Sequence, residues 1–284
     1  MTFSRLAIIG PGLLGGSIAM AVRRKAPGVH ISIWARRQEA VEEILDRQIV
    51  DFASTDLEAV TAKADVIVLC VPIGAMAPLA GKLAAFVAPH ALITDVGSVK
   101  APVVKSLGRI FEHRGRFIGS HPMAGSEQTG IDAARADLFE GSVCILTPDG
   151  TSAGRDVEAV REFWTMLGCE PKILSPAEHD EVIALVSHLP HLLAATLVNL
   201  VCAQNANSLN FCGNGFRDTT RVASGSPGMW TEIFGGNRGQ LKKSVQAMIE
   251  KLQEVVRFID DDAKMEQFLI NAKTERDRLK KGKQ

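Results

Sequence analysis

Arg5-Leu6-Ala7-Ile8-Ile9-Gly10-Pro11-Gly12-Leu13-Leu14-Gly15 is the stretch that decides the fold. Residues 5–9 form an apolar run typical of a buried strand, and the apolar periodicity of residues 13–24 predicts a helix. Between them, the glycines allow a tight turn, close approach of backbone amides to a pyrophosphate, and close packing of helix on strand. This context favours a dinucleotide site over a glycine turn without a ligand. The predicted contact residues are Gly10, Gly12, Leu13, Leu14 and Gly15, with Val71 and Pro72 after a later strand.

Strands and helices alternate through the first part of the chain. Apolar runs predict further strands at residues 29–34, 64–71, 91–96, 117–120, 142–146 and 171–174, and helical periodicity is found at residues 39–47 and 153–167. Such alternation is typical of a doubly wound sheet with helices on its faces. We therefore predict a Rossmann-like, mostly parallel α/β domain over residues 1–175.

The sequence after residue 175 predicts helices. Ser175-Pro176-Ala177-Glu178 combines a capping box with proline at the first helical position, so a domain of helices is predicted over residues 176–284. Its first helix, to about residue 204, is apolar almost all round and needs burial on every side. His188, Pro190, His191 and Asn199 would be costly in lipid, which favours a buried bundle helix over a membrane span. We predict an all-α dimerisation domain that forms a homodimer. Its later helices are expected near residues 216–223, 227–234, 238–259 and 262–280.

The composition of the chain indicates which kinds of ligand it binds. The 284 residues include 32 Lys plus Arg and 32 Asp plus Glu, so no basic footprint for nucleic acid is present and a small-molecule substrate is expected. The five cysteines are scattered without the paired spacing of a zinc site, so no metal is predicted. They read as buried thiols in a reducing compartment, and no export signal opens the chain. We expect a cytoplasmic protein.

The end of the second predicted strand bears on the choice of cofactor. An NAD site usually places an acid there to bind the ribose hydroxyls. This chain has Trp34-Ala35-Arg36-Arg37 instead. Two guanidinium groups suit a 2′-phosphate, although a solvated arginine pair at a helix start is the alternative. The sequence predicts NADP as the preferred cofactor, with NAD still usable.

Gly119-Ser120-His121-Pro122-Met123-Ala124-Gly125-Ser126-Glu127 places a histidine in a loop bounded by glycine and proline. Such loops often carry catalytic residues. An imidazole with an ordinary pKa near 6.5 is well suited to act as a general base at neutral pH. His121 is therefore the candidate base beside a redox cofactor.

The chain resembles the prephenate and arogenate (cyclohexadienyl) dehydrogenases of tyrosine biosynthesis over nearly its whole length. The resemblance rests on the glycine turn and on four further motifs, which are Asp95-Val96-Gly97-Ser98-Val99-Lys100, His121-Pro122-Met123-Ala124-Gly125, Ser187-His188-Leu189-Pro190-His191, and Gly215-Phe216-Arg217-Asp218-Thr219-Thr220-Arg221 followed by Met229-Trp230. It implies oxidation of a cyclohexadiene at its hydroxyl-bearing carbon with loss of the ring carboxylate as carbon dioxide.

The same resemblance implies roles for individual residues. His121 would accept the hydroxyl proton, Ser98 would orient the histidine and the hydroxyl, and Arg221 would bind the ring carboxylate. His191 would line the pocket beside the substrate side chain, while Ser126 and Glu127 would tune substrate choice or close the pocket. Because these residues come from both predicted domains, the site is expected in the cleft between them.

Structural alternatives stay open for most of these residues. Ser98 is equally suited to cap a helix, and Arg221 to pair with Asp218 or Glu232. His188 is better explained as a hydrogen-bonded core residue. Ser126 and Glu127 fit a solvated loop, and Trp230 fits core or interface packing.

The substrate side chain is not specified by any charge pattern, and we favour prephenate over arogenate. Two other functions remain as alternatives. One is a β-hydroxyacid-type NADP dehydrogenase, which typically uses a lysine base on its helical domain. The other is a catalytically silent NADP-binding sensor, which would not need His121 together with Arg221.

Overall fold

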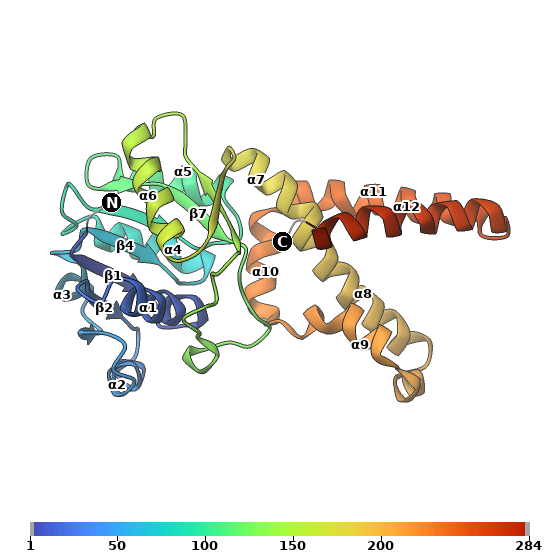
Figure 1. Cartoon of the computed structure of the whole chain (residues 1–284), viewed down its shortest axis with the longest axis horizontal. Coiled ribbons are helices and arrows are strands. Elements are labelled where there is room, and N and C mark those ends of the chain that lie inside the picture. Colours follow the sequence, from blue (N-terminus) through green and yellow to red (C-terminus); the bar gives the residue numbers. More distant parts are fainter. Residues whose placement is uncertain (1–2, 282–284) are drawn as a thin grey trace. The chain divides into compact units, whose positions relative to one another are not determined.

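The computed structural model describes residues 3–281, and the chain divides after Arg238 into two compact units. The strands are β1 (Arg5–Ile9), β2 (His30–Trp34), β3 (Phe52–Ser54), β4 (Val66–Leu69), β5 (Leu92–Asp95), β6 (Arg116–Phe117), β7 (Gly119–Pro122), β8 (Val143–Thr147) and β9 (Glu170–Ile173). The α-helices of the first unit are α1 (Leu13–Lys25), α2 (Gln38–Asp46), α3 (Leu57–Thr61), α4 (Ile73–Leu83), α5 (Ala101–Phe111), α6 (Gly154–Met166), α7 (Pro176–Ile183), α8 (Leu189–Gln204), α9 (Asn214–Thr220) and α10 (Pro227–Gly236) (Figure 1).

A six-stranded sheet in the order β3-β2-β1-β4-β5-β6 forms the centre of the first unit, and every pairing in it is parallel. The order reverses direction beside β1, which places the glycine turn after β1 next to the loop after β4. The predicted doubly wound, mostly parallel sheet is confirmed. Strand β3 was not predicted, because its three residues are too few to show a periodicity.

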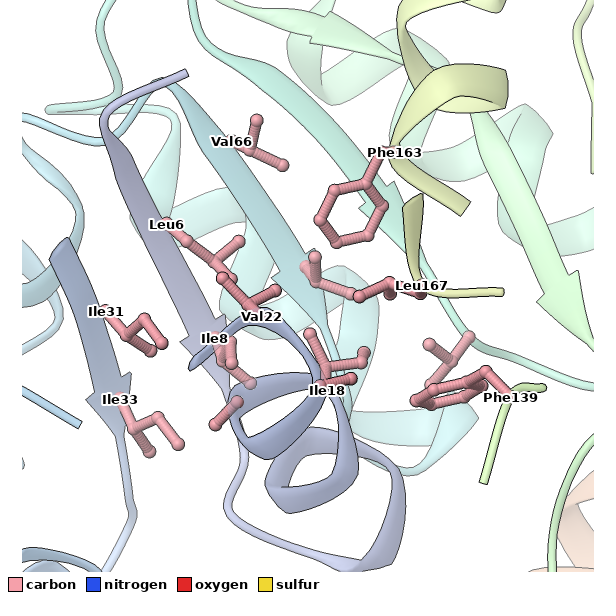
Figure 2. Packing of buried hydrophobic residues seen from close by; sticks show 14 of the residues in the cluster. Leu6, Ile8, Ile18, Val22, Ile31, Ile33, Val66, Phe139, Phe163 and Leu167 are labelled. Carbon is pink, nitrogen blue, oxygen red and sulfur yellow. The ribbon is translucent and has the colours of Figure 1, made fainter. Parts of the chain in front are cut away.

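One face of this sheet packs against α1. Ile8, Ile18 and Ile31 are completely buried there, and Figure 2 shows Ile18 and Val22 of α1 lying over the strands, with Phe163 and Leu167 beside them. Each such side chain contributes roughly 1.5–3 kcal/mol when it is fully buried. This core holds the carboxyl ends of β1, β4 and β5 rigidly, and the candidate site is built on those ends.

A second sheet, in the order β7-β8-β9, corrects the prediction of a single strand over residues 117–120. β6 pairs with β5, and Ile118 still donates its amide to the carbonyl of Ile93. The next residue, Gly119, already pairs with Thr147 of β8. A Cβ on Gly119 would lie 2.5 Å from the Thr147 hydroxyl, so the crossing requires glycine. The chain changes sheets immediately before His121.

The predicted long helix from residue 176 to about 204 is interrupted. α7 ends at Ile183 and a π-helical turn, Ala184–His188, precedes α8, with the amide of Leu189 donating to the carbonyl of Ala184. Pro190 explains the break, because it has no amide hydrogen and its ring collides with the carbonyl four residues earlier. The capping box at Ser175 and Glu178 forms as predicted.

The helical segment Pro176–Gln204 is long and apolar enough to span a membrane, with a mean hydropathy of 1.6, and 33% of its apolar window is buried. Val182, Leu185, Val186 and Leu200 are exposed on it. Cys202 is also exposed, so the expectation of buried thiols is wrong at this position, although Cys144 and Cys169 are buried. The reason is that the other segments of the first unit cover only part of this apolar segment.

The second unit consists of two long helices, α11 (Arg238–Phe258) and α12 (Asp262–Lys281). The two helices form a hairpin, and the rings of Phe258 and Phe268 meet at a centroid distance of 5.8 Å (Figure 1). Many apolar side chains of this hairpin stay exposed, namely Ile249, Leu252, Val256, Ile259, Leu269, Ile270 and Leu279.

Candidate active site

The glycine turn after β1 has the geometry that a pyrophosphate needs. Gly10 has a φ of +115°, and a Cβ there would lie 2.6 Å from the carbonyl of Cys70. A Cβ on Gly15 would lie 2.0 Å from the carbonyl of Gly10, so helix α1 can start close to the strand only with glycine. Gly12 faces open space within the described chain, and no side chain caps the start of α1. The amides at this helix start are therefore available for an anion.

The loops that follow β2 and β4 flank this turn. Arg36 and Arg37 directly follow β2; both are exposed, and neither forms an ion pair with a residue of the described range. Val71 follows β4, and Pro72 stands immediately before α4. The arrangement fits a dinucleotide with its pyrophosphate over α1 and leaves two cations at the position where an acid would bind ribose hydroxyls.

His121 lies on β7 and is 6% exposed. Its Nδ1 is 2.9 Å from Nε2 of His179 on α7, and the two rings meet at a centroid distance of 5.1 Å. His179 is completely buried, and its Nδ1 lies 2.8 Å from Oδ1 of Asp180. A buried chain of three side chains thus runs from the strand into the first helix after the sheets.

Asp180 is anchored at the start of α5. Its Oδ1 accepts a hydrogen bond from the amide of Lys100 at 2.7 Å, and its Oδ2 accepts one from the amide of Ala101 at 2.9 Å. A carboxylate that only accepts requires Nδ1 of His179 to carry the hydrogen. Nε2 of His179 then accepts from Nδ1 of His121, which leaves the lone pair of His121 on Nε2. The geometry thus selects the tautomer that can act as a base.

Electrostatics favour the neutral form of this imidazole. Burial, together with His179, Lys100 and His188, holds the pKa of His121 well below its ordinary value. Burial also lowers the pKa of His179, although the carboxylate of Asp180 opposes the change. Desolvation penalises the charged form of an imidazole and so keeps it ready to accept a proton.

Arg221 is 58% exposed in its side chain, and its NH1 lies 2.7 Å from Oε2 of Glu127. Within the described residues, Arg221 forms neither of the alternative ion pairs with Asp218 or Glu232, and Oε2 of Glu232 accepts the amide of Gly74 at 3.0 Å. Two residues that the sequence analysis placed at the substrate, 94 positions apart, are therefore in direct contact. A guanidinium held by one carboxylate can exchange it for the carboxylate of a ligand.

His188 ends the π-helical turn, and His191 lies in the first turn of α8. His191 stacks on Trp230 with 3.6 Å between ring centroids, and its buried Nδ1 has no hydrogen-bond partner within residues 3–281. His188 is completely buried, with its Nδ1 3.3 Å from the side-chain Nδ2 of Asn237, and burial lowers the pKa of His188 to about 4. The core interpretation of His188 therefore fits its surroundings. Trp230 packs on the face of His191.

Ser98 lies half-buried in the loop between β5 and α5. It does not cap α5, since that helix starts after Lys100 and its N-terminal amides are bound by Asp180. The exposed Ser126 accepts a hydrogen bond from the amide of Gln128 at 3.1 Å. Neither serine contacts His121 through a hydrogen bond in the part of the chain that the structure describes.

His179 and Asp180 are the site residues that sequence reasoning missed. They stand in the first turns of a helix whose start the capping box located correctly, so an adjacent His-Asp pair there was a usable signal. Lys100 ends one of the motifs that carry the resemblance, but no role was predicted for it.

Comparison with known proteins identifies the family of this chain. Residues 18–174 match the sequence model of the prephenate dehydrogenase nucleotide-binding domain, and residues 175–273 match that of the prephenate dehydrogenase dimerization domain. The chain belongs to the prephenate dehydrogenase family. Cyclohexadienyl dehydrogenase of Zymomonas mobilis is 32% identical, covering 94% of this chain and 93% of the relative. Prephenate dehydrogenase of Bacillus subtilis is 34% identical over 96% of this chain and 76% of its own length.

Solved structures of the family have the same fold. Prephenate dehydrogenase from Aquifex aeolicus, in complex with hydroxyphenyl propionate and NAD+, superposes with a TM-score of 0.91 at 30% identity and covers 98% of this chain and 99% of its own. Arogenate dehydrogenase from Synechocystis gives a TM-score of 0.81 at 32% identity, over 97% and 99% of the two chains. A 3-hydroxyisobutyrate dehydrogenase from Mycobacterium tuberculosis, at 13% identity and a TM-score of 0.55, shares the fold alone.

Proposed function

We propose that this protein catalyses the NADP-dependent oxidative decarboxylation of prephenate to 4-hydroxyphenylpyruvate, a step of tyrosine biosynthesis. The observation that carries the proposal is the orientation of His121, whose Nε2 lone pair is set by the hydrogen bonds through His179 to Asp180. Membership of the prephenate dehydrogenase family supports it. Oxidation of the amino counterpart, arogenate, is the second candidate, because the similar Synechocystis protein is an arogenate dehydrogenase.

The residues divide the chemistry between proton transfer and substrate binding. His121 accepts the proton of the ring hydroxyl at Nε2, and the paired His179 and Asp180 disperse the positive charge that the imidazole gains. Ser98, in the loop after β5, orients the hydroxyl. A bound nicotinamide would supply the acceptor for the hydride from the hydroxyl-bearing carbon. The turn of Gly10, Gly12 and Gly15 holds the dinucleotide over the start of α1.

Substrate carboxylate and side chain would contact the helical segments. Arg221 binds the ring carboxylate, which leaves as carbon dioxide, and Glu127 holds the guanidinium in place until the substrate arrives. His191, fixed by its stack on Trp230, lines the pocket beside the substrate side chain. All these residues precede Arg238 and so lie within the first compact unit.

The assay that tests this function supplies the purified protein with prephenate or arogenate and with NADP or NAD, and follows absorbance of the reduced cofactor. Turnover of prephenate with release of carbon dioxide is expected. Turnover of arogenate alone would replace the substrate assignment. Inactivity with all four combinations would refute the function.

Cofactor preference is proposed from the arginines after β2. Because Arg36 and Arg37 are exposed and lack ion pairs within the described chain, they are free to bind a 2′-phosphate. Arg36→Ala is expected to lower kcat/KM for NADP by about tenfold or more, since a charge-assisted hydrogen bond contributes about 1.5–3 kcal/mol. The value for NAD should change little. A wild-type protein that favours NAD, with kinetics indifferent to this substitution, would contradict NADP preference.

We also propose a cytoplasmic homodimer that forms through the helical segments. The exposed apolar side chains of the segment Pro176–Gln204 and of the α11–α12 hairpin are more than a monomeric protein usually leaves in water. His179 and Asp180 of the apolar segment bond to β7 and α5, which argues against a membrane location. Sedimentation should give twice the chain mass at micromolar concentration. A monomer under those conditions would exclude the dimer.

A further inference from the structure

Lys100 is completely buried, which is unusual for a lysine. Its ammonium group forms an ion pair with Asp95 at the end of β5 and donates a hydrogen bond to the carbonyl of Ser120 at 2.9 Å. Ser120 immediately precedes His121 on β7. Burial of a lysine carries a desolvation cost that a hydrocarbon side chain would avoid, so core packing alone does not explain the residue.

The Asp95–Lys100 ion pair binds both backbone groups of Ser120, its N–H and its carbonyl. Oδ1 of Asp95 accepts the Ser120 amide at 3.1 Å, while Lys100 binds the Ser120 carbonyl. The Ser120 hydroxyl donates to the carbonyl of Asp95 at 2.5 Å and accepts from Nε1 of Trp164 at 3.0 Å. Rotation of the backbone just before His121 would break several of these bonds together.

Lys100 also supports the opposite side of His121. Its backbone amide donates to Oδ1 of Asp180 at 2.7 Å, and the same oxygen lies 2.8 Å from Nδ1 of His179. Lys100 therefore binds both β7, which carries His121, and the carboxylate of Asp180, which orients His179 and through it His121. Displacement of this loop would move both supports of the imidazole.

We propose that Lys100 is a positioning residue for the proton transfer at His121, acting through Ser120 on one side and through Asp180 and His179 on the other. This inference rests on the proposed function, in which His121 accepts the hydroxyl proton. Lys100 itself touches neither substrate nor cofactor in this role. Its partner Asp95 keeps the ammonium charge compensated inside the protein.

Lys100 also acts on the proton affinity of the base. Among the described residues, the titratable groups that lower the pKa of His121 are His179, Lys100 and His188, and those that raise the pKa of Lys100 include Asp95, Asp180 and Cys144. A neighbouring positive charge disfavours the imidazolium form and lowers the pKa of His121. Removal of the ammonium should therefore raise that pKa toward its ordinary value while His121 stays buried, a change that a purely structural role of Lys100 does not predict.

The test compares Lys100→Met with Arg116→Met. Arg116 forms an ion pair with Asp156 at 2.6 Å. It lies on β6 beside Leu92, at the amino end of β5, whereas Asp95 and Lys100 lie at the carboxyl end of that strand. Lys100→Met should lower kcat by about tenfold or more, since misplacement of a catalytic group by about 1 Å has effects of that size. The acid limb of kcat/KM should move up by about half a unit or more. Arg116→Met should lower thermal stability and leave both quantities unchanged.

Asp95→Asn/Lys100→Met provides a second variant, because it leaves no unpaired charge in the interior if Lys100→Met does not fold. Its kcat should also fall and its acid limb should also rise. Histidine NMR titrations report the pKa and tautomer of His121 without turnover, so they test Lys100 even if the proposed substrate is wrong. A kcat within twofold of wild type with an unmoved His121 titration, in either variant, would overturn the proposal. Equal changes in Arg116→Met would overturn it as well.

Discussion

His121→Ala is expected to lower kcat by about 10²- to 10⁴-fold, the range typical for the loss of a general base. The reason is that Nε2 of His121 holds the lone pair selected by His179 and Asp180, whereas the Nε2 lone pair of His179 is already used to accept from His121. Steady-state kinetics with saturating cofactor measure the effect. Dinucleotide affinity, followed by fluorescence titration, should stay within about threefold, because the substitution leaves the glycine turn intact.

The pH profile provides an independent check on the same residue. His121 acts in its unprotonated form, and burial places its pKa well below the ordinary value near 6.5. As pH falls, kcat/KM should therefore hold through pH 6.5 and decline only below it. Exposed His113 serves as the matched control, since His113→Ala should leave kcat and the profile unchanged. An acid limb centred at or above 6.5, or an active His121→Ala variant, would remove His121 from the base role.

Arg221→Ala is expected to raise KM for the substrate by about 10- to 100-fold with a smaller change in kcat. A charge-assisted hydrogen bond of about 1.5–3 kcal/mol corresponds to that range. Uniform loss of ground-state and transition-state binding appears in KM, which is why the effect should fall there. Initial rates across substrate concentration, with cofactor saturating, give the two constants separately.

Two further variants test whether Arg221 acts as a carboxylate clamp. Arg155→Ala removes an exposed arginine on α6 and should change neither constant. Arg221→Lys keeps the charge but loses the planar fork, so its KM should lie between those of wild type and Arg221→Ala. An effect of Arg221→Ala confined to kcat would show that the guanidinium acts on the chemical step and not as a carboxylate clamp.

Much of the fold was accessible from local patterns. The glycine turn, the alternation of strands and helices, and the capping box at Ser175 are each encoded within a few residues, and the structure has all three. The errors arose where the outcome depends on distant partners. Whether residues 116–122 form one strand or two is decided by β5 and β8, which compete for pairing on either side of Ile118.

In the candidate site too, local motifs identified residues, whereas contacts between distant segments were not predicted. His121 and Arg221 were found from motifs, but their partners were not, because the His121–His179 and Arg221–Glu127 contacts join residues 58 and 94 positions apart. No periodicity reports such pairs. Their formation depends on how β7, α7 and the loop after β7 pack.

The sequence by itself determined the parallel α/β unit, the dinucleotide turn and the residue types of the active site, because turns, caps and apolar periods act over a few neighbours. The tertiary structure alone decided the tautomer of His121, the pairing of Arg221 with Glu127 and the burial of Lys100. Those features depend on desolvation and on hydrogen bonds between distant segments. Both arise only when the chain is packed.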